Sequence, residues 1–349
     1  MSGVQLIEVK QDEADQRLDR WFRKRFPQIG QIRLEKLCRK GEIRVDGGRV
    51  KGATRLEAGQ SVRIPPLPKS DDRPPAPKKV DAMSPEDVKL IQSLVIYRDD
   101  DIIALNKPAG LATQGGSGIV KHVDGMADGL KFGYDEKPRL VHRLDKDTSG
   151  VLLLARTSKA AQALTKAFRN RTTRKVYWAA VAGSPMPKMG TIRFGLVKAA
   201  GHGPHGAGEK MICIHPDDVA DNKDAKHATT DYSVMEEAGK RTSWVALAPI
   251  TGRTHQLRAH MAEIGHPIVG DGKYGTNSQT NEGDGWGAQL GGDISRKLHL
   301  HARSITLDHP FTKARLVLTA PLPEHMARTW EMLDWHAKWA PADPFEHFG

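Results

Sequence analysis

The spacing of apolar residues predicts two short helices near the start of the chain. Residues 17–26 (RLDRWFRKRF) place apolar side chains at helical intervals, with arginine and lysine on the other face. The apolar positions are Leu18, Trp21, Phe22 and Phe26. A second helix is expected from about Ile32 to Arg39. Gly41 ends it, because glycine readily takes the left-handed conformation found at helix C-termini.

After these helices the pattern changes to that of strands. Residues 42–45 (EIRV) alternate polar and apolar side chains and lead into Asp-Gly-Gly, a combination typical of hairpin turns. A returning strand at 49–51 (RVK) and a closing strand at 61–65 (SVRIP) follow. The first part of the chain is therefore predicted to be a small helix–helix–hairpin module.

Beyond this module the chain separates into a linker, a long body and a tail. Residues 65–88 are proline-rich, charged and poor in large apolar side chains, which predicts an extended linker. Residues 89–335 are long enough for one larger domain, and residues 336–349 form a tail without a clear pattern. Within the body, residues 199–228 and 276–293 are rich in glycine and polar residues and are expected to be loops.

The most informative stretch of the body is residues 139–156 (RLVHRLDKDTSGVLLLAR). Its VLLLA run (151–155) is continuously apolar and predicts a strand buried on both faces. A cluster of charged and polar side chains precedes this run: His142, Arg143, Asp145, Lys146 and Asp147. Such a cluster beside a buried strand is costly unless it is paired or functional, so a functional turn is one interpretation. The alternative is a surface turn in which Asp147 and Thr148 cap one another.

The net charge of the chain indicates which class of molecule it binds. The formal net charge of +11 and the pI of about 9.5 favour a polyanion, either nucleic acid or an anionic membrane surface. Residues 17–55 contain thirteen lysines and arginines against four acidic residues, so most of the excess lies in the first module. This distribution is typical of an electrostatic surface for phosphates.

Other features of the sequence indicate a cytoplasmic protein. No apolar run approaches the 18 residues that a membrane-spanning helix needs, and the N-terminus lacks the apolar stretch of a signal peptide. The two cysteines, Cys38 and Cys213, are far apart and are expected to be reduced thiols.

Residues 15–64 resemble an S4 RNA-binding domain. The resemblance rests on the leading Arg-Leu-Asp, the basic second helix ending in glycine, the Val-Asp-Gly hairpin and the closing Leu-x-x-Gly-x-x-Val. It implies that the second helix and the hairpin lie against structured RNA. The residues expected to bind it are Arg33, Lys36, Arg39, Lys40 and Arg44.

The segment HRLDKDTSGVLLLA closely resembles the signature of the RluA/RluC/RluD family of pseudouridine synthases. The similarity extends through IYRDDDIIALNKPAG, GGSG, KVYWAAVAG, TGRTHQLRAHMAEIGHPIVGDGKYG and HLHARSITLDHPFT. Together with the S4-like module, the GGSG loop makes the chain most similar to the RluC branch. Gln114 departs from that branch, whose members often carry histidine there.

The resemblance implies a role for four residues. Asp145 matches the invariant catalytic aspartate, and Tyr177 matches the active-site tyrosine that stacks on the target base. Arg258 matches the basic residue that pairs with the aspartate, and Arg143 matches the arginine that enters the space left by the flipped uridine. An ionised aspartate in a dry pocket needs a nearby cation, which Arg258 would supply. A structural or capping role is expected for His255, His260 and His266, rather than metal binding.

The implied fold is α+β: an S4-like module beside a catalytic domain with a mixed, largely antiparallel sheet and a central RNA-binding cleft. The implied reaction is the isomerisation of uridines to pseudouridine in large-subunit (23S) ribosomal RNA. Since isomerisation neither adds nor removes atoms, no cofactor or metal is expected. A monomer is the expected state.

Three alternatives remain open at this point. A relative acting on tRNA would share every catalytic residue. A glycoside or nucleoside hydrolase would need a second carboxylate, for which Asp147 is the nearby candidate. A non-catalytic RNA-binding or ribosome-assembly factor would use the basic module without any chemistry.

Overall fold

The fold was established from a computed structural model that describes residues 3–67, 83–116, 118–199, 210–275 and 294–346. The chain divides into two compact units, Met1–Ala82 and Met83–Gly349. Most of the predicted linker (68–82), part of one predicted loop (200–209) and all of another (276–293) lie outside the described residues.

The first unit is a four-stranded sheet with two helices. Its elements are β1 (Gln5–Glu8), η1 (Gln11–Glu13), α1 (Leu18–Arg25), α2 (Gln31–Lys40), β2 (Arg44–Val45), β3 (Gly48–Arg49) and β4 (Ser61–Ile64). The strand order is β1-β4-β2-β3. The predicted apolar faces of both helices pack into one core with Val62 and Ile64 of β4. The predicted boundary at residue 15 is too late, because β1 pairs with β4 along its whole length.

The second unit is built on one large sheet. Its strands are β5 (Val95–Arg98), β6 (Ile102–Lys107), β7 (Arg139–Leu140), β8 (Ser149–Ala155), β9 (Arg174–Ala182), β10 (Met189–Lys198), β11 (Met211–Ile214), β12 (Lys226–Ala238), β13 (Thr242–Pro249), β14 (Leu300–Asp308) and β15 (Arg315–Thr319). The order is β11-β10-β12-β13-β9-β14-β8-β6-β5, with β15 beside β14 and β7 beside β8. Among the named strands only β14 and β8 run parallel, so the predicted mixed, largely antiparallel sheet is confirmed.

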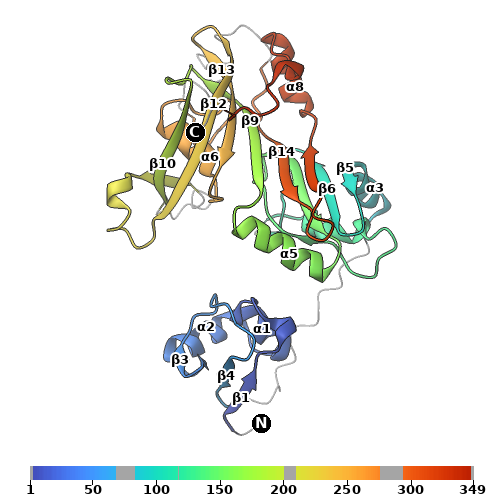
Figure 1. Ribbon diagram of the computed structural model, residues 1–349, viewed down its shortest axis with the longest axis vertical. Helices are drawn as coiled ribbons and strands as arrows, with labels where there is room; N and C mark the ends of the chain where they lie inside the picture. The colour runs from blue at the N-terminus through green and yellow to red at the C-terminus, as the bar shows by residue number, and fades with distance from the viewer. Residues whose placement is uncertain (1–2, 68–82, 117, 200–209, 276–293, 347–349) are drawn as a thin grey trace. The chain divides into compact units, whose positions relative to one another are not determined.

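Helices cover both faces of this sheet (Figure 1). They are α3 (Pro85–Ser93), α4 (Val123–Met126), η2 (Ala127–Leu130), α5 (Ser158–Arg169), η4 (Pro216–Asp218), α6 (Gln256–Glu263), α8 (Glu324–Met332) and η6 (Ala337–Trp339). α3 begins at Pro85, so the last residues assigned to the linker belong to this unit. β11 lies within the predicted 199–228 loop, where it pairs with β10. In the part of the chain that the structure describes, no helix is long and apolar enough to cross a membrane.

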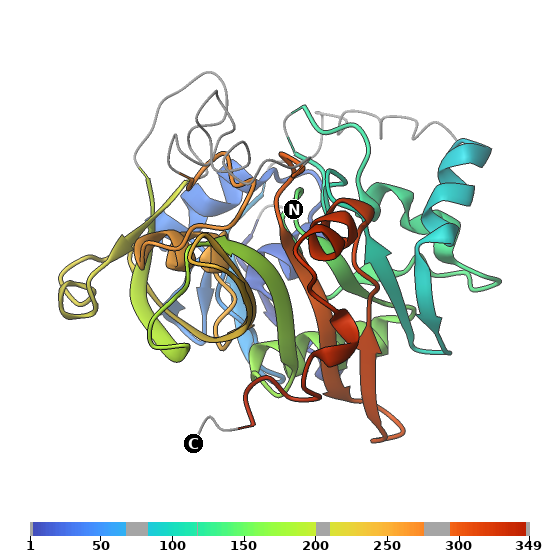
Figure 2. The ribbon, with the colours of Figure 1, turned by 90° about the horizontal axis from the view of Figure 1, so that it is seen from above.

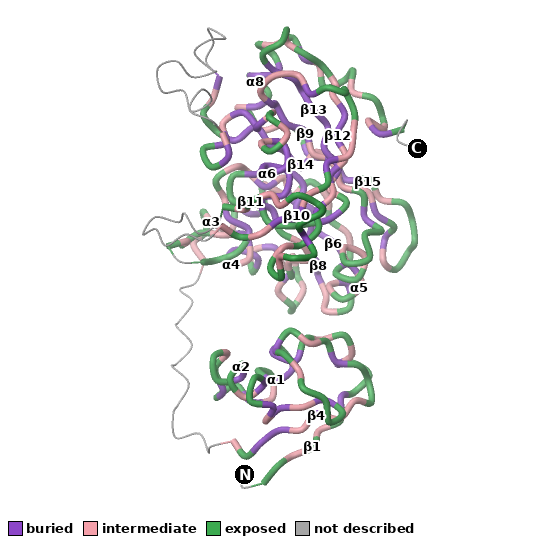
Figure 3. Tube along the Cα trace, turned by 90° about the vertical axis from the view of Figure 1, so that its left-hand side faces the viewer, coloured by how far each residue is buried: buried purple, intermediate pink, exposed green. Residues whose placement is uncertain are grey.

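β8 explains the apolar run that the sequence showed. Every residue of Ser149–Ala155 is buried, and the purple trace in Figure 3 continues through the neighbouring central strands. Leu152 and Leu154 pack against a core that includes α3 and α4, while Val151 and Leu153 pack against α5. The strand is therefore held from two faces, as predicted for a fully apolar run.

The C-terminal segment is packed against the sheet, although its residues showed no clear pattern. Trp330 and Trp335 join Trp178 of β9 and Trp244 of β13 in one cluster, and Phe345 is buried with them. The red segment in Figure 2 shows this return of the chain to the sheet. Residues 336–346 thus belong to the second unit and are not a separate tail.

Candidate active site

The turn between β7 and β8 carries Asp145 and is fixed by hydrogen bonds from a neighbouring segment. Thr113 Oγ1 donates to the carbonyl of Leu144 at 2.7 Å and accepts from the Leu144 amide at 3.2 Å. The Gly110 amide donates to the Lys146 carbonyl at 2.9 Å. Because the residues on both sides of Asp145 are tied, the backbone that carries its side chain is held in place.

A buried lysine completes this anchoring. Lys107, the last residue of β6, is fully buried, and its Nζ donates to the carbonyls of Pro108, Leu111 and Lys146 at 2.9, 2.8 and 3.0 Å. These three contacts use all three donors of an ammonium group. Burial lowers the pKa of Lys107 to about 7, with the charge of Asp147 opposing that shift. Lys107 therefore stabilises the turn from inside the protein and does not face solvent.

Gly150 brings the turn that carries Asp145 close to β9, the strand that carries Tyr177. It lies at the start of β8, opposite Ala302 of β14, and Ala302 in turn lies opposite Tyr177 of β9. Tyr177 is packed between two apolar cores. Burial, with a smaller contribution from the negative charge of Asp145, raises the pKa of the Tyr177 hydroxyl. The structure therefore brings Tyr177 and Asp145 into one region, two strands apart in the sheet.

Arg258 lies on α6, where Leu257 and Met261 are buried in the core beside the sheet. Its Nε and Nη2 each donate to Asp271 at 2.7 Å, forming a bidentate pair. Burial alone would lower the pKa of Arg258, but the Asp271 carboxylate, with a smaller contribution from Asp145, holds it above its usual value. Asp145 is recorded as a favourable nearby charge for Arg258, so the direct pair expected between them stays a prediction. Because Asp271 is itself buried, its charge needs the partner that Arg258 provides.

His255 is the basic side chain recorded within 4 Å of Asp145 in the described part of the chain. Its Nε2 lies 3.9 Å from Asp145 Oδ2, and its Nδ1 lies 3.0 Å from the Tyr274 hydroxyl. His255 occupies the N-cap position of α6 but its ring makes no capping hydrogen bond, so of the two roles expected for it, structural or capping, the buried ring fits the structural one.

The remaining polar residues of the turn divide by exposure. Arg143, Lys146 and Asp147 are exposed, which leaves Arg143 accessible to RNA. His142 instead accepts a hydrogen bond from the Leu153 amide at 2.9 Å and stacks on Phe168. Burial lowers the pKa of His142 to about 3, so this imidazole is a neutral structural acceptor.

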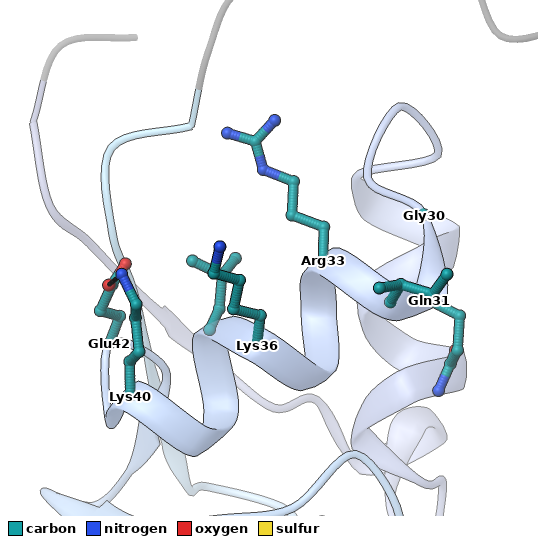
Figure 4. A pocket seen from close by; sticks show the side chains of 8 residues that line it. Gly30, Gln31, Arg33, Lys36, Lys40 and Glu42 are labelled. Atoms are coloured by element: carbon teal, nitrogen blue, oxygen red, sulfur yellow. Dashed lines mark ion pairs between the residues drawn. The ribbon is translucent and has the colours of Figure 1, made fainter.

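The basic residues predicted in the first unit lie on and beside α2. Arg33, Lys36 and Lys40 line a hollow of about 810 Å³ on this unit. In Figure 4 Arg33 and Lys36 point away from the helix, and Lys40 turns towards Glu42. Arg39 is exposed, whereas Arg44 donates to the carbonyls of Gly41 and Gly47 and so stabilises the hairpin.

Asp99, Asp101 and His309 form a cluster of possible metal ligands. His309 Nδ1 accepts from the amides of Phe311 and Thr312, so the ring hydrogen is on Nε2, which faces Asp99 at 3.2 Å. A metal on Nε2 would require the hydrogen on Nδ1, where two amide donors already point. These three side chains therefore fit a hydrogen-bonded contact that joins two segments of the chain better than they fit a metal centre.

Sequence reasoning missed several residues of this site. Lys107 was visible only as a lysine ending the apolar run IIALNK, and Asp271 and Tyr274 as part of DGKYG. Both segments belong to the stretches that carried the family resemblance, so a signal was present. Its meaning depended on contacts between distant parts of the chain.

Comparison with known proteins identifies the family. Residues 101–263 match the sequence model of the RNA pseudouridylate synthase family. The ribosomal large subunit pseudouridine synthase C of Vibrio vulnificus is 34% identical over 342 residues, covering 95% of this chain and 96% of that protein. This chain belongs to the RNA pseudouridine synthase family. It is therefore an isomerase.

Other pseudouridine synthases resemble it over similar lengths. The mitochondrial RNA pseudouridine synthase 4 of Arabidopsis thaliana is 36% identical over 379 residues, covering 90% of this chain and 78% of that protein. The solved structure of human RNA pseudouridylate synthase domain containing 4 superposes with a TM-score of 0.57 at 29% identity. That match covers 71% of this chain and 97% of the human one.

Proposed function

We propose that this pseudouridine synthase acts on uridines of large-subunit ribosomal RNA and that Asp145 is its nucleophile. The observation that carries the nucleophile assignment is the fixed turn: Asp145 is held by ties on both sides, near Tyr177 and the Arg258–Asp271 pair. The substrate assignment is supported by a relative similar over nearly its full length, which is named a large-subunit enzyme.

The chemistry needs one carboxylate. Isomerisation breaks the bond between C1′ and N1, turns the uracil, and forms a new bond from C1′ to C5, so that the proton on C5 moves to solvent and N1 gains one. Asp145 either attacks C1′ to form a covalent intermediate or removes the proton from C2′. A single ionised aspartate serves both routes.

The other site residues act on the base and on the duplex. A uridine must leave its stack to reach Asp145, which costs a few kcal/mol. Tyr177 offers an aromatic face worth roughly 1–3 kcal/mol per stacked base. Arg143, which is exposed, would fill the gap left in the RNA.

The first unit supplies the electrostatic attraction for RNA, in the manner of an S4 domain. Arg33, Lys36 and Lys40 line one hollow, with the exposed Arg39 on the same helix (Figure 4). Arg44 also donates to two carbonyls of the hairpin and so supports the shape of this surface. Lysines and arginines displaying their charge together are the usual basis of phosphate binding.

The test of the nucleophile is a matched pair of variants. Asp145→Asn removes the carboxylate without changing the size of the side chain, and pseudouridine formation should be lost while RNA affinity is retained. Asp147→Asn, two residues away and exposed, is the control and should keep near-normal activity. Residual activity of Asp145→Asn above a few per cent would overturn the assignment. Release of free uracil by the unaltered enzyme would instead indicate a hydrolase.

The test of the substrate is a map of pseudouridines in ribosomal and transfer RNA with and without the gene. Loss of sites in large-subunit ribosomal RNA alone supports the proposal, and loss in tRNA alone contradicts it. If no site changes in any RNA, the assembly-factor alternative gains support. We also propose that the protein is a monomer and that it is cytoplasmic, a compartment in which its two free cysteines would stay reduced.

A further inference from the structure

His255 adopts a backbone conformation that a histidine rarely takes. Its φ is 50°, in the left-handed region, at the residue before α6 begins. This conformation costs about 1 kcal/mol or more for residues with a β-carbon and persists only where the surrounding structure imposes it. The ring is buried, and one of its nitrogens faces Asp145. The strain therefore occurs at a residue whose side chain reaches the reacting carboxylate.

The hydrogen bonds around Tyr274 determine which nitrogen of His255 carries the hydrogen. The Tyr274 oxygen accepts from the Met211 amide of β11 at 2.8 Å. Its own hydrogen needs an acceptor, and His255 Nδ1, at 3.0 Å, is the acceptor recorded for it within the described ranges. If Nδ1 accepts, the hydrogen is on Nε2. Nε2–H then points to the Asp145 carboxylate.

We propose that His255 is a positioning residue that donates from Nε2 to Asp145 in the RNA-bound enzyme, with Tyr274 holding the required tautomer. The inference rests on the proposed role of Asp145. The present separation of 3.9 Å is longer than a hydrogen bond, and catalytic hydrogen bonds commonly shorten only when substrate is bound.

A neutral donor suits this task better than a cation. Burial lowers the pKa of His255; the charges of Asp145 and Asp271 oppose this shift, and those of Arg258 and Lys273 add to it. The imidazole is therefore neutral at neutral pH. Arg258 meanwhile gives both of its hydrogen bonds to Asp271. In the proposed arrangement His255 orients Asp145 through one oxygen, and the other oxygen stays available for the ribose.

Two substitutions of His255 separate positioning from folding. His255→Asn tolerates the left-handed conformation and places an amide near the Nδ1 position, but it is too short to reach Asp145. His255→Gln places an amide near the Nε2 position and can donate to Asp145. The rate of pseudouridine formation at saturating RNA should fall on the order of 10²-fold in His255→Asn, as expected for a misplaced reacting group, and recover several-fold in His255→Gln.

The pH profile gives a readout that a purely structural role would not change. Protonated His255 would form an ion pair with Asp145, and the added positive charge would make the carboxylate less nucleophilic and less basic. In His255→Gln that group is absent, so the acid limb of kcat should move to lower pH. Tyr274→Phe removes the hydroxyl that donates to His255 Nδ1, so the ring hydrogen is no longer held on Nε2. This variant should lower kcat with RNA affinity unchanged.

The outcomes are distinguishable. The inference is overturned if His255→Asn keeps kcat within twofold of the unaltered enzyme, or if both variants lose activity equally with equal losses of thermal stability. An active Asp145→Asn would contradict the proposed function itself, and that variant is measured first in the same assay.

Discussion

Gly150 is the residue at which the turn carrying Asp145 meets β14. A β-carbon at Gly150 would lie 2.2 Å from the Ala302 carbonyl oxygen, and its φ is 108°. Gly150→Ala should therefore lower the free energy of unfolding by at least about 3 kcal/mol, because both a backbone clash and strain are introduced. Pseudouridine formation should fall with it, measured beside denaturant unfolding.

The control for this substitution is Gly239→Ala in the β12–β13 turn. Gly239 also has a positive φ, of 60°, but an added β-carbon would meet nothing within 4 Å. Gly239→Ala should lower the free energy of unfolding by about 1–2 kcal/mol, the cost of a left-handed backbone conformation for alanine. Its activity should be unchanged. Equal losses in the two variants would show that the close approach to Ala302 is not the cause.

Lys107 offers a second test at the scale of one residue. Lys107→Met leaves the carbonyls of Pro108, Leu111 and Lys146 without this donor, which should cost about 3 kcal/mol and reduce kcat. Because burial lowers the pKa of Lys107 to about 7, the unfolded chain binds this proton more tightly than the folded chain above that pH. Stability should therefore rise from pH 7 to about 10 in the unaltered enzyme, a contribution missing from Lys107→Met. Lys146→Met, at an exposed position, is the control.

At the scale of elements, one buried carboxylate joins η1 to α1 in the first unit. Glu13 accepts from Trp21 Nε1 at 3.0 Å and from Arg25 at 2.7 Å. Burial alone would raise the pKa of Glu13, but these hydrogen bonds, chiefly that from Arg25, hold it below its usual value. The stability that Glu13 adds is thus fully present at a pH above the pKa of Glu13 in the unfolded chain. It is lost as the pH falls through the lower pKa that Glu13 has in the folded protein.

Glu13→Gln should destabilise the first unit by about 2 kcal/mol at neutral pH, because a charge-assisted hydrogen bond is weakened. Amide hydrogen exchange of α1 and β4 measures this without interference from the second unit. The difference should shrink as the pH falls below about 4. Glu8→Gln, at an exposed position of β1, should change neither value.

Periodicity predicted the elements whose burial is regular along the chain. The faces of α1 and α2 and the fully buried β8 were all correctly predicted from spacing. β1 and β11 were missed because no turn or alternating pattern marks them in the sequence, and each is defined by its pairing with β4 or β10. Asp271 and Tyr274 lie outside any periodic element, and their roles follow from contacts with Arg258 and His255.

The whole molecule divides its work between its two units. Asp145, Tyr177, Arg258 and their supports all lie in the second unit, while the densest positive charge lies in the first. RNA affinity and chemistry should therefore be separable by substitution. Affinity that comes from lysine and arginine is also the part that salt weakens, since each phosphate contact releases counterions.

Replacing Arg33, Lys36 and Lys40 together with alanine tests this division. RNA affinity should fall, and the slope of log affinity against log salt should become shallower by roughly two to three, about 0.7–0.9 per lost phosphate contact. The rate at saturating RNA should stay unchanged, because no reacting group is altered. A triple alanine variant of Arg315, Arg328 and Lys338, all exposed in the second unit, is matched in charge and should keep the original slope. If both triple variants change the slope equally, binding depends on overall charge, and the hollow beside α2 has no special role in holding the RNA.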